Sequence, residues 1–449
     1  MASILTDALP VLTELAPAFT QPTFRRAQLL VVAAVLSSGR RTIANLLRTL
    51  GALVPGQASS YHRVLSQARW SGLRLAALLL RLLLRHFWPT GRIRLVGDDT
   101  VDEHRGKHVY GKGRHRDAVR SSHSYTAFRY GHKWVVLAVL VSFPFARRPW
   151  ALPVLIALYR SPEENRRRGK PHKTPAELMQ LLLRIVLRWF PQRHFVFAGD
   201  SGFGSHALAS FAARQQGRLS LVSRFVADAN LYEAAPVVVG KKPSGRPRGK
   251  GAKLPPPQAV VATATRQRLT VSWYGGGCRR VEVVSAVGHW YKAGQGLVAV
   301  RWVYVHDVAG THRDDYLYST DTSLTAKEII EEYTGRWNIE TTFQEARAYL
   351  GLETTRGWKR ETVLRAAPCL LGLYTLVSVW YWQLPDSVKE DWGVLWAGKE
   401  SMTFSDAITA VRRWLWSDWV FATGGHDTAF AKLPQALQEV LLTALTPAA

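Results

Sequence analysis

Two aspartates, each placed after a short apolar run that predicts a strand, are the first residues whose spacing suggests chemistry. Asp98 comes after residues 92–96, and Asp200 comes after residues 194–198. In open sheets flanked by helices, ligand sites gather at the carboxyl ends of strands, because a rigid strand aims the following side chain into a crevice. Glycine or serine flanks both acids, so a ligand can approach them. Taken singly, an aspartate after a strand is also an ordinary turn residue.

A third acid, Glu340, lies in a helix predicted from Thr325 to about Leu350. At about 100° per residue, four polar side chains of this helix fall within an arc of roughly 60°: Tyr333, Arg336, Glu340 and Arg347. An apolar stripe lies immediately beside them, so the polar arc borders a buried contact. A carboxylate flanked by two arginines and a phenol suits a site for a metal and a phosphate. The alternative is a solvated face with salt bridges between residues four apart.

The segments around the two aspartates predict the elements that would position them. Strands are expected at 92–96, 134–145, 150–159, 194–198 and 219–223. Helices are expected at 174–190, where Thr174 and Glu177 form a capping box, and at 203–217. The order of three strands, helix, strand, helix and strand predicts an α/β fold in which helices flank a mixed sheet.

At roughly 150 residues per domain, 449 residues allow about three domains. Strand-like, turn-rich sequence predicts a β-rich insertion domain at 226–320, with a basic loop at 240–257. The expected divisions are a helical N-terminal DNA-binding or dimerisation region at 1–90, a core at 91–225 and 321–358, and a helical C-terminal region at 359–449. Within 1–90, a helix-turn-helix and an ordinary helical hairpin fit the pattern equally.

The formal charge of +26 favours a polyanionic partner, although a merely soluble basic protein is the alternative. Two distant cysteines, Cys278 and Cys369, make a disulfide framework or a structural zinc site improbable and fit a reducing, cytoplasmic compartment. The N-terminus has no basic stretch before its apolar residues, so a signal peptide is not expected. The uncharged stretch 366–385 is nearly long enough to span a bilayer, but its composition favours a buried helix.

A resemblance adds to this interpretation. The spacing Tyr333-x2-Arg336-x3-Glu340-x6-Arg347 resembles the Y-x2-R-x3-E-x6-K motif of bacterial insertion-sequence transposases, which belong to the DDE superfamily and have an RNase H-like fold. The last position differs, because arginine stands where the motif has lysine. The segments around Asp98 and Asp200 are similar to the first and second aspartate strands of that family. Residues 316–321 resemble the strand before the glutamate helix, so the similarity covers 92–355.

The resemblance implies that Asp98, Asp200 and Glu340 bind two Mg²⁺ ions, for which Mn²⁺ can substitute, and catalyse cleavage and strand transfer. Asp99 is the rival to Asp98, but the family pattern Asp-x-Thr matches Asp98 through Thr100. The implied partner is double-stranded DNA, meaning the terminal inverted repeats and the target, bound by a homodimer in the synaptic complex. The implied route passes through a DNA hairpin, and the implied compartment is the bacterial cytoplasm, with the nucleoid. The alternatives are an RNase H-fold nuclease without strand transfer and a non-catalytic DNA-binding protein derived from a transposase.

Further residues are candidates for DNA contact. Tyr333, Arg336 and Arg347 would hold phosphates near the cleaved end. The basic loop contributes four cations, with a solvated linker as the alternative: Lys241, Lys242, Arg246 and Arg248. Three tryptophans of the insertion are candidates for stacking an extruded base, although each is individually more typical of a core aromatic: Trp273, Trp290 and Trp302.

Overall fold

The computed structural model describes residues 10–117, 121, 124–236, 249–386, 388–389, 399–421 and 427–446. Its strands are β1 (Arg92–Glu103), β2 (Gly113–Arg116), β3 (Phe128–Val141), β4 (Trp150–Tyr159), β5 (His194–Gly199), β6 (Leu219–Arg224), β7 (Leu231–Tyr232), β8 (Gln267–Ser272), β9 (Cys278–Lys292), β10 (Gly296–Asp307) and β11 (Asp315–Ser319). Its helices are α2 (Pro10–Thr13), α3 (Gln21–Leu36), α4 (Ile43–Leu50), α5 (Ala58–Ser66), α6 (Gly72–Phe87), α7 (Pro162–Arg167), α8 (Pro175–Trp189), α9 (His206–Ala213), α10 (Pro257–Thr263), α11 (Ala326–Gly335), α12 (Asn338–Leu350), α13 (Arg360–Gln383), α15 (Phe404–Trp414), α16 (Asp427–Ala431) and α17 (Gln435–Leu445).

Five strands form the centre of the sheet, in the order β4-β3-β1-β5-β6. The pairs β1–β5 and β5–β6 are parallel, whereas β1–β3 and β3–β4 are antiparallel. A short connection joins the antiparallel neighbours β3 and β4, whereas residues 104–127, with β2, lie between β1 and β3. The chain enters β5 from α8 and β6 from α9, because parallel pairing requires crossover connections. The fold is therefore the predicted α/β fold, a mixed sheet with the strand order of an RNase H-like core.

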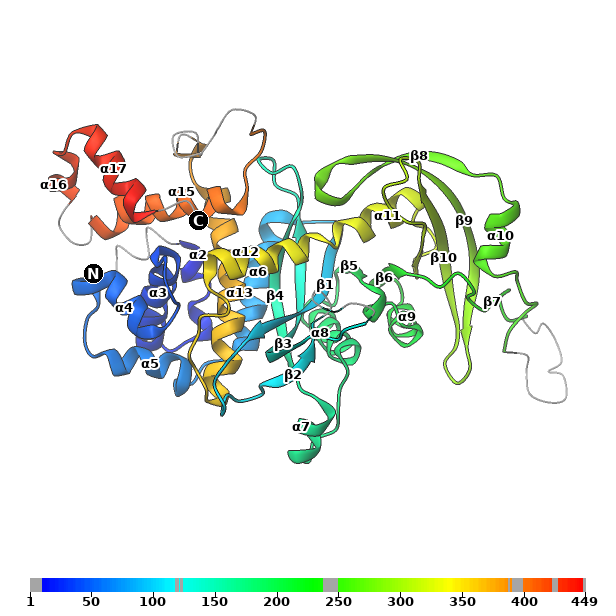
Figure 1. The fold of residues 1–449 in the computed structure, drawn as a ribbon, viewed down its shortest axis with the longest axis horizontal. Coiled ribbons are helices and arrows are strands. Elements are labelled where there is room, and N and C mark those ends of the chain that lie inside the picture. Colours follow the sequence, from blue (N-terminus) through cyan, green and yellow to red (C-terminus); the bar gives the residue numbers. More distant parts are fainter. Residues whose placement is uncertain are drawn as a thin grey trace.

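The sheet does not end at β6. Strand β11 pairs with β6, and β10 and β9 continue outward from β11, so the strands of the described chain join one 11-stranded sheet. Figure 1 shows β8, β9 and β10 as a long twisted extension beside α10, on the opposite side of the core from the N-terminal helices. The predicted insertion, 226–320, thus contributes β11 to the central sheet itself, and only β7 to β10 extend beyond it.

The two faces of the central sheet are covered by different helices. Gly97 of β1 faces α8, because a Cβ at this position would lie 2.4 Å from the methyl group of Met179. Since successive side chains of a strand point to opposite faces, Asp98 points away from α8. Helix α12 packs on β1 and β4, and Arg336, which lies just before its N-terminus, donates a hydrogen bond to Asp98. Figure 1 shows α11 and α12 running in succession along this second face. A carboxylate at position 98 is therefore directed toward the glutamate-bearing helix.

The helix predicted from Thr325 to Leu350 is interrupted. Helix α11 ends at Gly335 and α12 begins at Asn338, with Arg336 and Trp337 in a tight turn between them. The backbone N–H groups of Arg336 and Trp337 donate to carbonyls three residues earlier, and the Asn338 side chain donates to the Gly335 carbonyl at 2.8 Å. Gly335 also approaches the Leu140 side chain, which a Cβ would meet at 3.0 Å. Close packing of α11 on the sheet and local capping thus override a continuous helical pattern.

Helix α13, the apolar segment of the sequence, is one core helix. In the described chain it is the single helix long and apolar enough to cross a membrane by length and composition, and 67% of its most apolar window is buried. Pro368 does not interrupt it. Thr375 donates to the Pro153 carbonyl of β4 at 2.8 Å, and Tyr374 donates to Glu345 of α12 at 2.7 Å. These buried polar contacts support the interpretation as a core helix that backs the sheet and α12.

Candidate active site

Asp98 and Asp200 occupy neighbouring positions at the edge of the parallel part of the sheet. The parallel pairing of β1 with β5 ends at Gly97 and Gly199, so each aspartate follows the last paired residue of its strand. Asp98 does not come after the end of its strand as predicted, because β1 continues to Glu103 in antiparallel pairing with β3. Asp200 does leave its strand, and its carboxylate accepts hydrogen bonds from the Gly202 and Phe203 N–H groups at 2.9 and 3.3 Å.

The Arg336 side chain joins Asp98 to Glu340. Its Nη1 lies 2.8 Å from Asp98 Oδ2, and its Nη2 lies 3.2 Å from Glu340 Oε1. The exposed fraction of the side chains rises from 9% for Arg336 and 16% for Asp98 to 39% for Glu340, so the group opens to solvent on the glutamate side. Acids separated by more than 200 residues in the sequence therefore meet at one guanidinium.

Asp99 lies on the other face of β1. Side chains two apart on a strand share a face, so Asp99 points to the same side as Gly97, toward α8. Its carboxylate pairs with Lys133 Nζ at 3.0 Å. Asp98, by contrast, shares its face with Thr100 and reaches the Arg336 guanidinium. The geometry therefore favours Asp98 over Asp99 as the partner of Glu340.

Burial and the neighbouring charges shift the pKa values of the ionisable groups in this site. Burial, together with the charges of Asp200 and Asp99, raises the pKa of Asp98 to about 7 against the opposing effect of Arg336. Burial lowers the pKa of Arg336, but the charges of Asp98, Glu340 and Asp200 outweigh it and hold this pKa above its usual value. Such a cluster is relieved by positive charge, and its hard oxygen donors are those that Mg²⁺ prefers. The chemistry of these donors therefore fits a divalent cation, although the carboxylate oxygens of Asp98, Asp200 and Glu340 do not all lie within 4.8 Å of one another.

Tyr333 and Arg347 lie at the two ends of the polar arc. Tyr333 is buried, burial raises the pKa of its phenol, and the Arg336 guanidinium carbon lies 5.8 Å from its ring centre. Arg347 anchors α12 to β1: it donates to the Thr100 hydroxyl and, at 3.2 Å, to the Val101 carbonyl, and it pairs with Glu353 at 3.0 Å. The Nε and Nη2 groups of Arg347 therefore bind protein groups in this structure.

These contacts of Arg347 predict a mild effect of the motif's own residue. Arg347→Lys keeps the charge but cannot make the forked contacts, so we expect a loss of about 1–2 kcal/mol in the free energy of unfolding. The measurement is urea denaturation followed by far-UV circular dichroism, with Arg356→Lys at an exposed position of the same region as the control. Equal stability of the Arg347→Lys variant and the wild type would contradict the anchoring role.

The three tryptophans that were candidates for base stacking differ in their burial. Trp302 is 1% exposed and belongs to the core between β9 and β11, so its ring offers no face to a base, contrary to its candidacy. Trp290 is half-buried and packs edge-on against Phe225 and Tyr318. Trp273 lines a small cavity together with Tyr274 and Tyr333, next to the polar arc. The four basic-loop candidates lie outside the described residues: Lys241, Lys242, Arg246 and Arg248.

The sequence patterns also missed residues beside the site. Trp337, between Arg336 and Glu340, is 38% exposed and meets Tyr274 edge-on. Its position after Arg336 was the only available signal. Further along β1, a groove of about 790 Å³ has three arginines, two glutamates and an exposed tryptophan on its walls, and we call it the basic groove: Arg40, Arg105, Arg356, Glu103, Glu353 and Trp358. Cations interleaved with an aromatic face are typical of nucleic-acid surfaces.

Comparison with known proteins identifies the family. No curated protein is similar enough in sequence to match the chain. Among solved structures, the chain is similar to the piggyBac transposase synaptic complex with hairpin DNA, determined by cryo-EM, at 12% identity and a TM-score of 0.40, over 99% of this chain and 83% of that chain. The family model of an archaeal transposase, ISC1217, matches residues 292–370. The family model described as a DDE superfamily endonuclease matches residues 14–280, more than half of the chain, and the chain therefore belongs to the DDE superfamily.

Proposed function

We propose that this protein is a DNA transposase that cuts DNA at the ends of a mobile element and joins those ends to target DNA, by cut-and-paste through a hairpin intermediate. The observation that carries the proposal is the bridge from Asp98 through Arg336 to Glu340, on the face of β1 that adjoins Asp200. Asp98 and Glu340 bind one buried guanidinium, and Asp200 follows the strand next to β1. Carboxylates from separate elements can in this way supply the oxygen ligands that metal-dependent phosphodiester chemistry requires.

Asp98, Asp200 and Glu340 would hold two Mg²⁺ ions, with Mn²⁺ able to substitute. When bound, such a pair activates the attacking oxygen and stabilises the leaving oxygen of a phosphodiester. Each residue has a part of its own. The Asp200 carboxylate is fixed by two backbone N–H groups, and the Asp98 carboxylate by a rigid strand. Arg336, released from the carboxylates, would donate to the phosphate, and Tyr333 would hold Arg336 in place.

The reaction starts with water attacking a phosphorus atom at the element end, which breaks the P–O bond and frees a 3′-OH. That hydroxyl then attacks the opposite strand and displaces its 3′ oxygen, closing a hairpin. Hydrolysis of the hairpin restores the 3′-OH, which attacks the target strand. Trp337 and Trp273, which lie beside the polar arc, would stack a base extruded near the cleaved end.

The partner is double-stranded DNA, both the terminal inverted repeats and the target. The charge of +26 and the basic groove with Arg105 and Arg356 support this partner. Holding two ends together calls for a homodimer in the synaptic complex. The compartment that we propose is the bacterial cytoplasm, where the nucleoid offers the target.

The test is incubation of the protein with Mg²⁺ and DNA ends taken from the sequence that flanks its own gene. We expect nicks, hairpins and joined products, all of which disappear in EDTA. Nicks without hairpins or joined products would favour a nuclease of the same fold that lacks strand transfer. Binding without any cleavage, in Mg²⁺ or Mn²⁺, would favour a non-catalytic DNA-binding protein derived from a transposase.

A further inference from the structure

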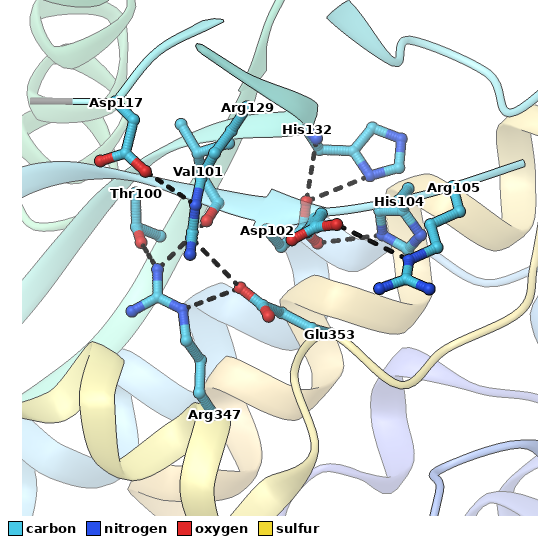
Figure 2. Close-up of polar contacts among 11 residues, drawn as sticks. Thr100, Val101, Asp102, His104, Arg105, Asp117, Arg129, His132, Arg347 and Glu353 are labelled. Atoms are coloured by element: carbon cyan, nitrogen blue, oxygen red, sulfur yellow. Dashed lines mark hydrogen bonds and ion pairs between the residues drawn. The ribbon is translucent and has the colours of Figure 1, made fainter. Parts of the chain in front are cut away.

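A second group of ligand-type side chains lies on β1, four residues beyond Asp98. Asp102, His104 and His132 are all buried, and one nitrogen or oxygen from each lies within 4.8 Å of the others. Asp102 and His132 are direct partners in the antiparallel pairing of β1 with β3. Figure 2 shows the two imidazoles converging on the Asp102 carboxylate. Asp102 and His132 lie on adjacent strands, and His104 directly follows β1, where its backbone N–H donates to the Tyr130 carbonyl of β3 at 3.0 Å.

The hydrogen bond that His132 makes through Nε2 determines which of its two ring nitrogens carries the hydrogen. Its Nε2 lies 2.9 Å from the Tyr110 carbonyl oxygen, which can only accept, so Nε2 carries the hydrogen. In the neutral ring, Nδ1 then presents a lone pair. This atom is buried, makes no hydrogen bond, and lies 3.3 Å from Asp102 Oδ1, which is itself an acceptor. Two buried acceptors that face each other require a positive charge between them.

The distances in the group are long for charge-assisted hydrogen bonds, although the contact of His104 with Asp102 is within hydrogen-bonding range. His104 Nε2 lies 3.3 Å from Asp102 Oδ2, and His132 Nδ1 lies 3.3 Å from Asp102 Oδ1. A charge-assisted hydrogen bond is shorter, about 2.7–2.9 Å. Ligands about 2.0–2.1 Å from a tetrahedral metal, however, are separated from one another by about 3.3 Å. Both ion-pair distances therefore match the edge of a tetrahedron around a small ion.

We propose that Asp102, His104 and His132 form a binding site for a borderline divalent cation, Zn²⁺ by its chemistry, distinct from the catalytic acids. Two imidazoles and one carboxylate are donors that suit zinc, whereas Mg²⁺ prefers oxygen ligands alone. The fourth position would be taken by water from the groove, which His104 lines. The Tyr110 carbonyl, as the acceptor from His132 Nε2, orients the ring and fixes its tautomer, as outer partners of metal-bound histidines do.

The position of the site gives it a structural task. His104 lies at the point where β1 ends and the chain enters the wall of the basic groove that contains Arg105 and His108. A cation that ties His104 to His132 and Asp102 would pin this wall to the sheet. On the other side of the cluster, Arg129 of β3 pairs with Asp117 at 3.0 Å and approaches Glu353 at 3.8 Å (Figure 2). The proposed ion would thus order the groove without taking part in cleavage.

The experiment uses the full chain, purified without a histidine tag and stripped with a chelator. Titration with Co²⁺ is followed by the visible absorption of a four-coordinate cobalt site, and Zn²⁺ is then added as competitor. We expect one equivalent of Co²⁺ to bind and to be displaced by Zn²⁺. Asp102→Asn and His104→Ala should each weaken binding by about 100-fold or more, because each removes one of three ligands.

Two matched variants separate this site from other metal binding. His306→Ala removes a half-exposed histidine that pairs with Asp314 at 2.8 Å, and it should leave the titration unchanged. Glu340→Gln disables the catalytic acids and should also leave it unchanged. Asp102→Asn keeps the shape of the side chain, and a cooperative thermal transition checks that each variant is folded. The proposal is overturned if the folded wild type binds no Co²⁺, or if binding persists in both Asp102→Asn and His104→Ala.

Discussion

Replacing Glu340 by glutamine is expected to lower the rate of DNA cleavage by about 1,000-fold or more, equivalent to at least about 4 kcal/mol of transition-state stabilisation. Glutamine keeps the size of the side chain and can still accept a hydrogen bond from Arg336, but it loses the negative charge that holds a divalent cation. The fold should be unaffected, because the carboxylate is 39% exposed. The measurement is single-turnover cleavage of a labelled element end in Mg²⁺, together with DNA binding in Ca²⁺.

The matched control is Glu361→Gln. Glu361 lies at the start of α13, its side chain is 44% exposed, and it pairs with an arginine, as Glu340 does. Its loss should change the cleavage rate less than twofold, because its partner is its neighbour Arg360 at the start of α13 and not Arg336 of the candidate site. If Glu340→Gln cleaves at the wild-type rate while Glu361→Gln also does so, the assignment of the third acid is wrong. If both variants lose activity together with DNA binding, the loss reports on folding and not on catalysis, because removing a negative charge does not weaken binding to DNA.

Much of the fold followed from local patterns. The apolar run 150–159 predicts β4 at its observed bounds, and the Thr174–Glu177 capping box opens α8 as expected. The succession of strands and helices was sufficient to predict the mixed sheet. These elements were predictable because their residues agree with one periodicity and with strong end signals. The membership of the DDE superfamily is likewise confirmed, whereas the specific motif branch stays a prediction.

Features that depend on pairing across the sheet could not be predicted. Residues 98–103 form the second half of β1, although the segment is polar, because the register with β3 supplies their backbone partners. The union of β11 with β6 likewise depends on contacts between segments about 90 residues apart. The group of Asp102, His104 and His132 became visible only once that register placed Asp102 opposite His132. No spacing in the sequence marks such a pair.

Within the candidate site, sequence and structure contributed different parts. The spacing from Tyr333 to Arg347 identified the polar arc, and the structure places Arg336 and Glu340 beside Asp98. The choice between Asp98 and Asp99 needed the strand, because only alternation of faces separates two adjacent acids. The turn at Arg336–Trp337 needed tertiary packing, because the helical pattern runs through it without a proline. The sequence therefore identifies candidate residues for a cation site, and the strand and helix topology determines which of them lie close together.

In the absence of divalent ions, Asp98→Asn is expected to make the protein more stable above neutral pH, even though it should abolish cleavage. Burial, with the charges of Asp200 and Asp99, raises the pKa of Asp98 from 3.8 to about 7 in the folded chain. Between these two values the folded state holds a proton that the unfolded state has released. The wild type therefore loses stability as pH rises from about 4 to about 7, and the loss is complete above the folded pKa. Asparagine resembles the protonated acid and removes this slope.

The expected difference is close to zero at pH 4 and grows to at most about 4 kcal/mol at pH 8, from about three pKa units. Subtracting the variant's denaturation free energies from those of the wild type, pH by pH in EDTA, cancels the contribution of other groups. Adding Mg²⁺ at pH 8 should stabilise the wild type and leave the variant unchanged, because only the wild type has the charge that binds the ion. A wild type that gains stability relative to Asp98→Asn as the pH rises would mean that Arg336 outweighs burial and lowers the pKa of this carboxylate. The wild type is thus expected to be less stable than the variant in EDTA and to be stabilised by Mg²⁺. Both effects have one cause, because the buried negative charge that destabilises the metal-free protein is the charge that attracts the ion.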